Sequence, residues 1–257
     1  MTTRSIWKGI IRLGALAVPV KLYAALEEKS VHFRLLHARD LTPLRQEMVN
    51  PATGEAVPAE AIRHGYETEN GRLVILSEQE LQGLEPEPGR DIEIIRFLPG
   101  PAIDHRWYDH PYFLGPDDDR QAYFALAAAL NGAGTAGLAR WVMRNKEYFG
   151  VLRLQAGYPI LITLRHSEEV VALAKLQIPT GRESDPRELA LAEQLVAALA
   201  GSFDPGQYRD EYRQRVMGLI ASKASGKIIK LRKAAPKKTT TDLKQALEAS
   251  LQAARRR

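Results

Sequence analysis

The chain has 257 residues, of which 45% are hydrophobic, and it contains no cysteine. This length allows one large domain or one domain with appendages, and no stretch approaches the ~20 apolar residues that a membrane-spanning helix needs. The absence of cysteine excludes disulfides, thiolate zinc sites and cysteine nucleophiles, and it fits a reducing cytosol.

The net charge of +5 is unevenly distributed along the chain. Residues 200–257 hold 14 Lys/Arg and 5 Asp/Glu, whereas residues 1–199 hold 22 basic and 26 acidic residues. A basic terminal segment is typical of proteins that bind an anionic polymer or surface. Nucleic acid is therefore the leading candidate partner, and a membrane surface is the second.

The N-terminal stretch RSIWKGIIRLGALAVPVKLYAA, residues 4–25, has the basic-then-apolar order of a secretory signal peptide. A signal peptide needs about 7–15 uninterrupted apolar residues, and Arg12 interrupts this run. The alternating pattern instead predicts two strands, Ser5–Leu13 and Leu16–Ala24, with Gly14 in the turn between them. We therefore expect the segment to be retained and the protein to stay in the cytoplasm.

Further short β-rich runs predict strands at Val31–His37, Arg72–Leu76, Asp91–Leu98, Trp107–Leu114, Leu138–Arg144, Tyr148–Leu154 and Ile160–Leu164. Asn50–Glu55 has the composition of a turn. Ser77 and Glu80 form the capping-box pattern that starts a short helix. The last three runs read as a meander, so the first 165 residues are mainly β, with one strong helix at Asp117–Asn131.

Helical patterns replace β patterns after about Pro179. Asp185, Pro186 and Glu188 are an N-cap, a first-turn proline and a capping-box glutamate in order, and Gly201 is the expected stop. A second helix is predicted from about Pro205 to Ser222. A last amphipathic stretch, at residues 241–254, places leucines four apart.

The glycines at positions 132, 134 and 137 match the pattern G-x-G-x-x-G. In a dinucleotide-binding fold this pattern follows a strand and opens a helix. Here it follows the predicted helix and leads into a strand, so we expect a connection with Gly132 as the C-cap.

Acidic and histidine side chains cluster loosely between residues 104 and 119. If they converged on one point, they could serve a metal-dependent nuclease. The simpler interpretation is that the three aspartates Asp117–Asp119 stabilise a helix N-terminus. No H-E-x-x-H, G-x-S-x-G or Walker A pattern occurs. We therefore predict no catalytic residues, no metal, no cofactor and no small-molecule substrate.

Seven cations with no acid among them fall within 16 residues of the C-terminal part: Lys223, Lys227, Lys230, Arg232, Lys233, Lys237 and Lys238. Phosphate contacts carry no sequence information, so this segment predicts sequence-independent, salt-sensitive binding of nucleic acid. A general nucleoid-type DNA-binding protein acting through its tail would explain this charge, although it would leave residues 1–165 without a role.

Five long stretches of the chain carry a resemblance to one family. They are RSIWKGIIRLGALAVPVKLYAALEEKSVHFRLLH (4–37), RHGYETENGRLVILSEQELQGL (63–84), IEIIRFLPGPAID (92–104), HPYFLGPD (110–117) and ARWVMRNKEYFGVLRLQAGYPILITLR (139–165). Together these stretches resemble bacterial Ku proteins. The resemblance covers most of residues 3 to about 220. Some bacterial relatives carry cysteines near the turn that corresponds to Val49–Val57. This chain has no cysteine, so we expect no zinc knuckle there.

The resemblance implies a mainly β fold with α-helices, in which a Ku-core β-barrel carries a strand-rich bridging arm and two subunits form a ring around double-stranded DNA ends. It also implies recruitment of the ATP-dependent DNA ligase D in non-homologous end joining, with no catalytic activity. Residues 1–180 would form the core and arm, residues 181–221 a helical region for ligase recruitment, and residues 222–257 a Lys/Arg-rich extension. The protein would associate with the nucleoid and not with a membrane.

The family pattern also suggests which cations in the core would face DNA. Residues expected on the arm are Arg45, Arg63, Arg72, Arg96 and Arg106. Those expected elsewhere in the bore are Lys21, Arg34, Arg140 and Arg144.

Overall fold

The computed structural model describes residues 4–176, 181, 185–226 and 243–254. The chain divides into two compact units, one of residues 1–29 and 34–175 and the other of residues 30–33 and 176–257. The strands that form the barrel all belong to the first unit.

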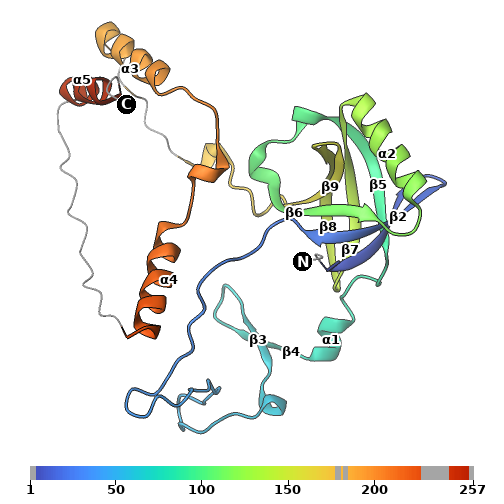
Figure 1. Ribbon diagram of the computed structural model, residues 1–257. Helices are drawn as coiled ribbons and strands as arrows, with labels where there is room; N and C mark the ends of the chain where they lie inside the picture. Colours follow the sequence, from blue (N-terminus) through green and yellow to red (C-terminus); the bar gives the residue numbers. More distant parts are fainter. Residues whose placement is uncertain (1–3, 177–180, 182–184, 227–242, 255–257) are drawn as a thin grey trace. The chain divides into compact units, whose positions relative to one another are not determined.

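Seven strands close into a barrel in the order β1-β2-β6-β9-β8-β7-β5 (Figure 1). Their bounds are β1 Trp7–Leu13, β2 Leu16–Ala24, β5 Asp91–Pro99, β6 Tyr108–Pro116, β7 Thr135–Met143, β8 Lys146–Gln155 and β9 Tyr158–Leu164. Neighbours are antiparallel except β1 and β5, whose parallel pairing closes the barrel. The predicted meander of the last three strands is confirmed.

The strand alternation read from the N-terminal sequence positions the core. Val18, Val20 and Leu22 of β2 are fully buried, whereas Leu16 at the start of the strand is half exposed. Gly14 turns the chain between β1 and β2 with φ of 57°, a conformation that glycine adopts without a steric penalty. The N-terminal segment is therefore part of the barrel wall, as its pattern predicts.

Helix α2 (Arg120–Ala133) packs on the barrel and adds Tyr123, Leu126 and Leu130 to its core. It contacts β2, β6, β7 and β8, which belong to different sides of the closed sheet. Asp119 caps its N-terminus by accepting a hydrogen bond from the Ala122 amide at 2.9 Å. A helix placed in this way closes one end of the barrel with its apolar face.

The predicted C-cap of this helix was wrong by two residues. Gly134, not Gly132, adopts the left-handed conformation, with φ of 60°, and its N–H donates to the Leu130 carbonyl. Helices commonly end at a left-handed glycine because it satisfies a free carbonyl of the last turn. The glycine motif lies between a helix and a strand, which is the reverse of a dinucleotide-binding loop.

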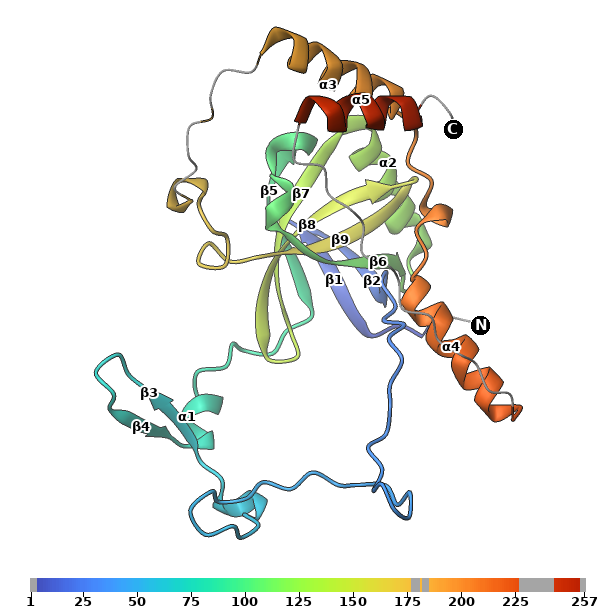
Figure 2. The ribbon, with the colours of Figure 1, turned by 90° about the vertical axis from the view of Figure 1, so that its left-hand side faces the viewer.

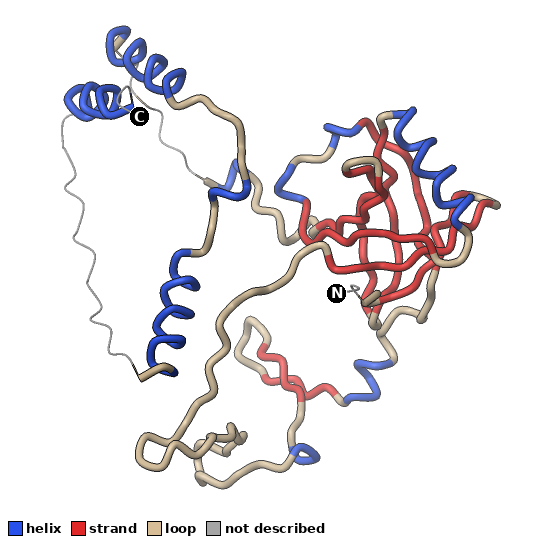
Figure 3. Tube along the Cα trace, in the orientation of Figure 1, coloured by secondary structure: helices blue, strands red, loops and turns tan. Residues whose placement is uncertain are grey.

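The arm, defined here as residues 34–90, lies in the chain between β2 and β5 and gives no strand to the barrel (Figure 3). Its regular elements are η1 Ala59–Ala61, β3 His64–Glu67, β4 Leu73–Leu76 and α1 Glu78–Gln82. β3 and β4 form a separate two-stranded sheet, and β3 was not predicted. The predicted turn at Asn50–Glu55 and the Ser77/Glu80 capping box are both confirmed.

The predicted strand at Val31–His37 was wrong. The structure shows one isolated bridge there, between Leu36 and Pro43, in otherwise irregular chain. Alternating side chains favour a strand only where another strand supplies hydrogen bonds. No strand among the described residues pairs with this segment.

The second unit is helical. α3 (Pro186–Ala198) follows the predicted cap Asp185, whose carboxylate accepts from the Arg187 amide at 2.8 Å. Its C-cap is Leu199, two residues before the predicted stop at Gly201. α5 (Leu243–Ala254) lies beside α3 (Figure 2). The single helix predicted from Pro205 is divided into η5 Pro205–Gln207 and α4 Glu211–Ala224. None of the helices in the described residues is long and apolar enough to cross a membrane.

Short 3₁₀ turns complete the first unit: η2 Gly100–Ala102 and η3 His105–Trp107 lie between β5 and β6, and η4 Leu173–Lys175 follows β9.

Candidate nucleic-acid interface

Four of the predicted DNA-contact residues already have acidic partners within the chain. The ion pairs are Lys21–Asp117 at 2.7 Å, Arg106–Asp104 at 2.8 Å, Arg140–Glu93 at 2.8 Å, and Arg45–Glu47. A cation bound to a neighbouring carboxylate contributes less field to a phosphate than a free one does. These four are therefore weaker candidates for DNA contact than the sequence alone suggested.

Asp117 is the most heavily engaged of these acids. Its carboxylate, which is 14% exposed, lies 2.7 Å from the Lys21 ammonium and 3.0 Å from that of Lys8. Hydrogen bonds donated by Lys21 and then Lys8 hold the pKa of Asp117 below its usual range, and the bond to Asp117 raises the pKa of Lys21. The cluster joins β1 and β2 to the end of β6, which is a structural role.

Arg140 pairs across the sheet because Glu93 of β5 is its direct partner in the register with β7. The hydrogen bond that Arg140 donates to Glu93 raises the pKa of Arg140 further above its already high value. Glu147 lies at the edge of contact, 4.0 Å from Arg140. The guanidinium is thus held on the outer surface of the barrel between two acids.

Two of the arginines expected on the arm lie elsewhere. Arg96 is on β5, a barrel strand, and Arg106 is in η3, between β5 and β6. Their placement on the arm was wrong because the chain returns to the barrel at Asp91, ahead of both residues. Arg106 is held by Asp104, whose pKa is lowered by hydrogen bonds from the Arg106 side chain and backbone.

The remaining predicted core cations have no acidic side chain as an ion-pair partner among the described residues. Within the described part of the chain, Arg34, Arg72, Arg96 and Arg144 make no ion pair. Arg63 instead donates to two backbone carbonyls, those of Glu60 and Ile62, at 2.5 and 2.8 Å. An arginine whose guanidinium is not held by a carboxylate is well suited to bidentate contact with a phosphate.

One pair of arginines that have no acidic partner in the described chain shares a cavity. Arg90, just before β5, and Arg144, in the turn after β7, line a space of about 430 Å³ together with Trp7 and Asn145. Asn145 donates to Glu85 at 2.7 Å, which ties this turn to the end of the arm. Two guanidinium groups facing one cavity create a site that favours an anion such as a phosphate. Sequence analysis missed Arg90 because its partner lies far along the chain.

Lys223 lies in the last turn of α4, where a cation suits the helix dipole. The other tail residues proposed for DNA contact fall outside the described residues: Lys227, Lys230, Arg232, Lys233, Lys237 and Lys238.

Four of the five aspartates considered for a metal site have another role, and the fifth, Asp118, is exposed. Asp104 and Asp119 cap η3 and α2, Asp117 binds two lysines, and Asp109 pairs with Arg165 at 3.1 Å. Across the part of the chain that the structure describes, no three His, Cys, Asp or Glu side chains are grouped to hold a metal ion.

The first unit is therefore a closed β-barrel that carries an arm and, among the described residues, several arginines without an acidic partner. The family model for the Ku70/Ku80 beta-barrel domain matches residues 12–191, which is more than half of the chain. The chain belongs to the Ku family.

Three curated relatives are similar over nearly their whole length. The non-homologous end joining protein Ku of Anaeromyxobacter sp. is 37% identical and covers 99% of this chain and 87% of its own. The non-homologous end joining protein Ku of Coxiella burnetii is 37% identical, and the match covers 98% of this chain and 95% of that protein. The non-homologous end joining protein Ku 2 of Geotalea uraniireducens is 36% identical, covering 98% of both chains.

Proposed function

We propose that this protein binds double-stranded DNA ends as a homodimeric ring in non-homologous end joining. In this role it protects and bridges breaks and recruits the ATP-dependent DNA ligase D, and it has no catalytic activity of its own. It would act in the cytoplasm, at the nucleoid. The names of its relatives support the pathway, and the arm supports the dimer.

The observation that carries the proposal is the apolar surface of the arm. In β4, Leu73 and Ile75 are each 64% exposed on one face of the two-stranded sheet, and Tyr66 of β3 is exposed on the other face, opposite Val74. Leu84, just after α1, is 82% exposed. An isolated two-stranded sheet is marginally stable in water, and soluble monomers rarely expose contiguous apolar patches of this kind.

A second copy of the chain is the simplest partner for such a surface. In a two-fold dimer the same patch is used twice, so each exposed arm would cover its equivalent. The arm also carries Arg72, which makes no ion pair within the described residues. An interface built on the apolar side chains would leave such arginines available for phosphates, which suits a protein that holds DNA without reading its sequence.

The topology of the DNA tests the ring directly. A ring loads at an end, so the protein should bind a linear duplex and fail to bind a covalently closed circle of the same length and sequence. Cutting the circle with a restriction enzyme should restore binding. Equal affinity for the two forms, at the same salt concentration, would contradict threading and favour the nucleoid-type alternative.

The ligase proposal rests on the second unit. α3 and the residues after it expose Val196, Leu199 and Phe203, which offer an apolar surface to another protein. We expect Val196→Asp to weaken binding to ligase D while leaving DNA binding intact. Calorimetry with purified ligase D and a gel-shift assay with a blunt duplex would measure the two separately. Unchanged ligase binding by this variant would place the contact elsewhere.

A further inference from the structure

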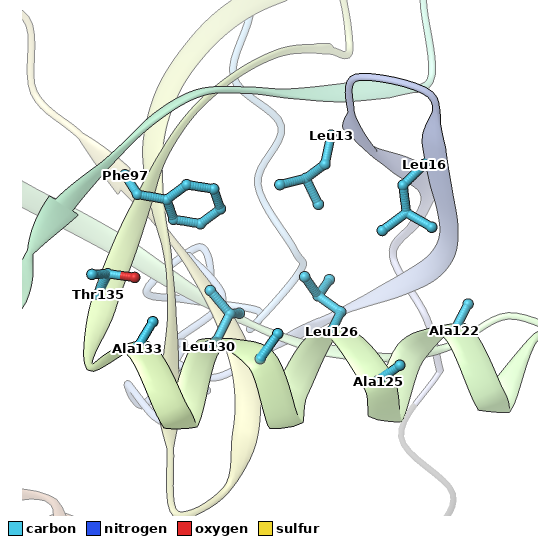
Figure 4. Close-up of a pocket in the computed structure, with 10 residues that line it drawn as sticks. Leu13, Leu16, Phe97, Ala122, Ala125, Leu126, Leu130, Ala133 and Thr135 are labelled. Carbon is cyan, nitrogen blue, oxygen red and sulfur yellow. The ribbon is translucent and has the colours of Figure 1, made fainter.

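An apolar groove runs between α2 and the facing wall of the barrel (Figure 4). Its volume is about 590 Å³. One wall comes from the β1–β2 hairpin and β5, and the other from one face of α2 and the start of β7. The lining residues are Leu13, Leu16, Phe97, Ala122, Ala125, Leu126, Ala129, Leu130, Ala133 and Thr135.

The groove exists because inward-facing positions meet side chains that are too short to fill the space. Leu16 continues the inward series of β2, yet it is 48% exposed. Phe97 points to the same side of the sheet as Ile94, since both would contact a side chain placed at Gly137, yet it is 45% exposed. Opposite them α2 presents alanines (Figure 4). Larger residues at these alanines would close the gap.

The groove has a polar, cationic end. Thr135 lines both the apolar groove and a smaller cavity of about 230 Å³, so the two spaces adjoin at this residue. Arg153 of β8 and Asn131 of α2 line that cavity. Within the described residues, Arg153 has no acidic partner. An occupant that lay in the groove and reached past Thr135 would therefore offer apolar groups to the groove and a negatively charged group to Arg153.

We propose that this groove docks a short peptide segment of another protein, in which two apolar side chains are followed by an acidic residue. The apolar side chains would bury Leu16 and Phe97, and the carboxylate would pair with Arg153. The charge of the cationic end selects the acidic residue, and the row of alanines lets a peptide backbone approach α2 closely. The proposal is independent of DNA binding because it uses none of the free arginines assigned to phosphate contact.

A peptide fits this site better than a free fatty acid does. Small-molecule sites enclose most of the surface of their ligand. Here both Leu16 and Phe97 are about half exposed, so the groove is open along its side. A peptide keeps its own backbone in water and inserts side chains, which suits an open groove.

A filling substitution tests the groove without touching the barrel core. Ala129→Leu places a larger side chain in the groove, whereas Ala128→Leu makes the same change at an exposed position of α2 that does not line it. The probes are fluorescein-labelled ten-residue peptides with leucine or phenylalanine at two positions followed by glutamate. Fluorescence anisotropy with the full-length protein measures their affinity. We expect Ala129→Leu to weaken binding by at least about tenfold and Ala128→Leu to leave it unchanged.

A charge exchange tests the polar end. Arg153→Glu should lower the affinity for glutamate-containing peptides by about two- to fivefold. It should raise the affinity for matched peptides that carry lysine in place of the glutamate. Binding of a blunt duplex at the same salt should stay within the range of the wild type. The proposal is overturned if no peptide binds the wild type with a Kd below about 1 mM. It is also overturned if Ala129→Leu binds as well as Ala128→Leu, or if decanoate binds and the peptides do not.

Discussion

The Lys21 ammonium lies 2.7 Å from the Asp117 carboxylate, and this pair joins β2 to the end of β6. The contact changes the interpretation of Lys21, which the family pattern placed against DNA. Asp117 is also bound by Lys8, so two cations share one carboxylate. A DNA phosphate would have to displace Asp117 to reach Lys21. The main role of Lys21 in this structure is therefore the ion pair that stabilises the barrel.

This cluster predicts an acid-sensitive part of the stability. Because the pKa of Asp117 is lowered in the folded state, its contribution is complete above the ordinary carboxyl pKa of about 3.9 and is lost as the pH falls through the lowered value. Asp117→Asn should therefore reduce the free energy of unfolding at about pH 6, and the gap from the wild type should narrow towards about pH 3. Urea titrations of the wild type and of Asp117→Asn at several pH values measure the difference in free energy of unfolding and its change with pH.

The neighbouring Asp118 provides a matched control. It is exposed, makes no ion pair within the described residues, and has φ of 67°, which asparagine tolerates well. Asp118→Asn should change stability little at any pH. A gap between Asp117→Asn and the wild type that stays constant from about pH 6 to about pH 3 would show that the carboxylate charge is not the stabilising feature.

The division between paired and free arginines predicts different effects on DNA binding. Arg144→Ala removes a free cation that shares a cavity with Arg90. We expect it to weaken binding of a blunt duplex and, if Arg144 binds one phosphate, to reduce the slope of log affinity against log salt by about 0.9. Arg140→Ala removes a cation already held by Glu93, so its slope should change less.

Gel-shift or anisotropy titrations at four or more salt concentrations give these slopes. Circular dichroism melts of both variants check that the fold is retained. If Arg140→Ala lowered the slope more than Arg144→Ala, internal ion pairing would be the wrong criterion for choosing DNA contacts.

The features that sequence reasoning predicted well depend on near neighbours. The Gly14 turn, the Ser77/Glu80 capping box and the Asp185 cap each involve residues within a few positions of one another. Hydrogen bonds and backbone preferences at that range follow from residue type alone. For the same reason, the alternating pattern of β2 identified its buried face.

The features that sequence reasoning missed depend on which strands, distant along the chain, become neighbours in the barrel. The positive charge of Arg140 is offset by Glu93, because the strand register places the two residues opposite each other. Arg90 and Arg144 share a cavity because the antiparallel pairing of β5 with β7 brings the start of β5 beside the end of β7. No local pattern carries this information. The segment Val31–His37 failed in the converse way: it has the pattern of a strand but no partner strand in the described residues.

A buried threonine predicts a specific decrease in stability. Thr163 of β9 is 2% exposed, and its hydroxyl accepts from the His110 amide at 2.9 Å, where the pairing of β6 with β9 is irregular. Thr163→Val keeps the shape of the side chain but leaves this amide without its acceptor. We expect the free energy of unfolding to fall by about 1–3 kcal/mol.

Thr163→Ser is the control, because it retains the hydroxyl and removes only a methyl group. Urea unfolding followed by tryptophan fluorescence would measure both variants. A serine variant less stable than the valine variant would show that packing, and not the hydrogen bond, is the main contribution of Thr163.

The exposed sheet of the arm predicts how the dimer can be broken. Ile75→Asp places a charge on β4 where an apolar partner surface is proposed. Sedimentation velocity should show a shift from dimer to monomer, because burying an unpaired carboxylate is costly. Val171→Asp, at an exposed position outside the arm, should remain dimeric. A wild-type protein that sediments as a monomer at micromolar concentration would contradict the homodimer itself.

The C-terminal charge predicts a measurable share of DNA affinity. Removing residues 223–257 deletes eleven Lys/Arg and two acids, Asp242 and Glu248. The salt slope should fall by about 0.9 for each phosphate that the tail binds, so a tail that engages DNA gives a clearly flatter slope after its removal. The preference for a linear duplex over a closed circle should persist, because in the ring proposal threading depends on the barrel and arm. An unchanged slope would show that the tail does not bind DNA, whereas disappearance of the end preference would favour the nucleoid-type alternative.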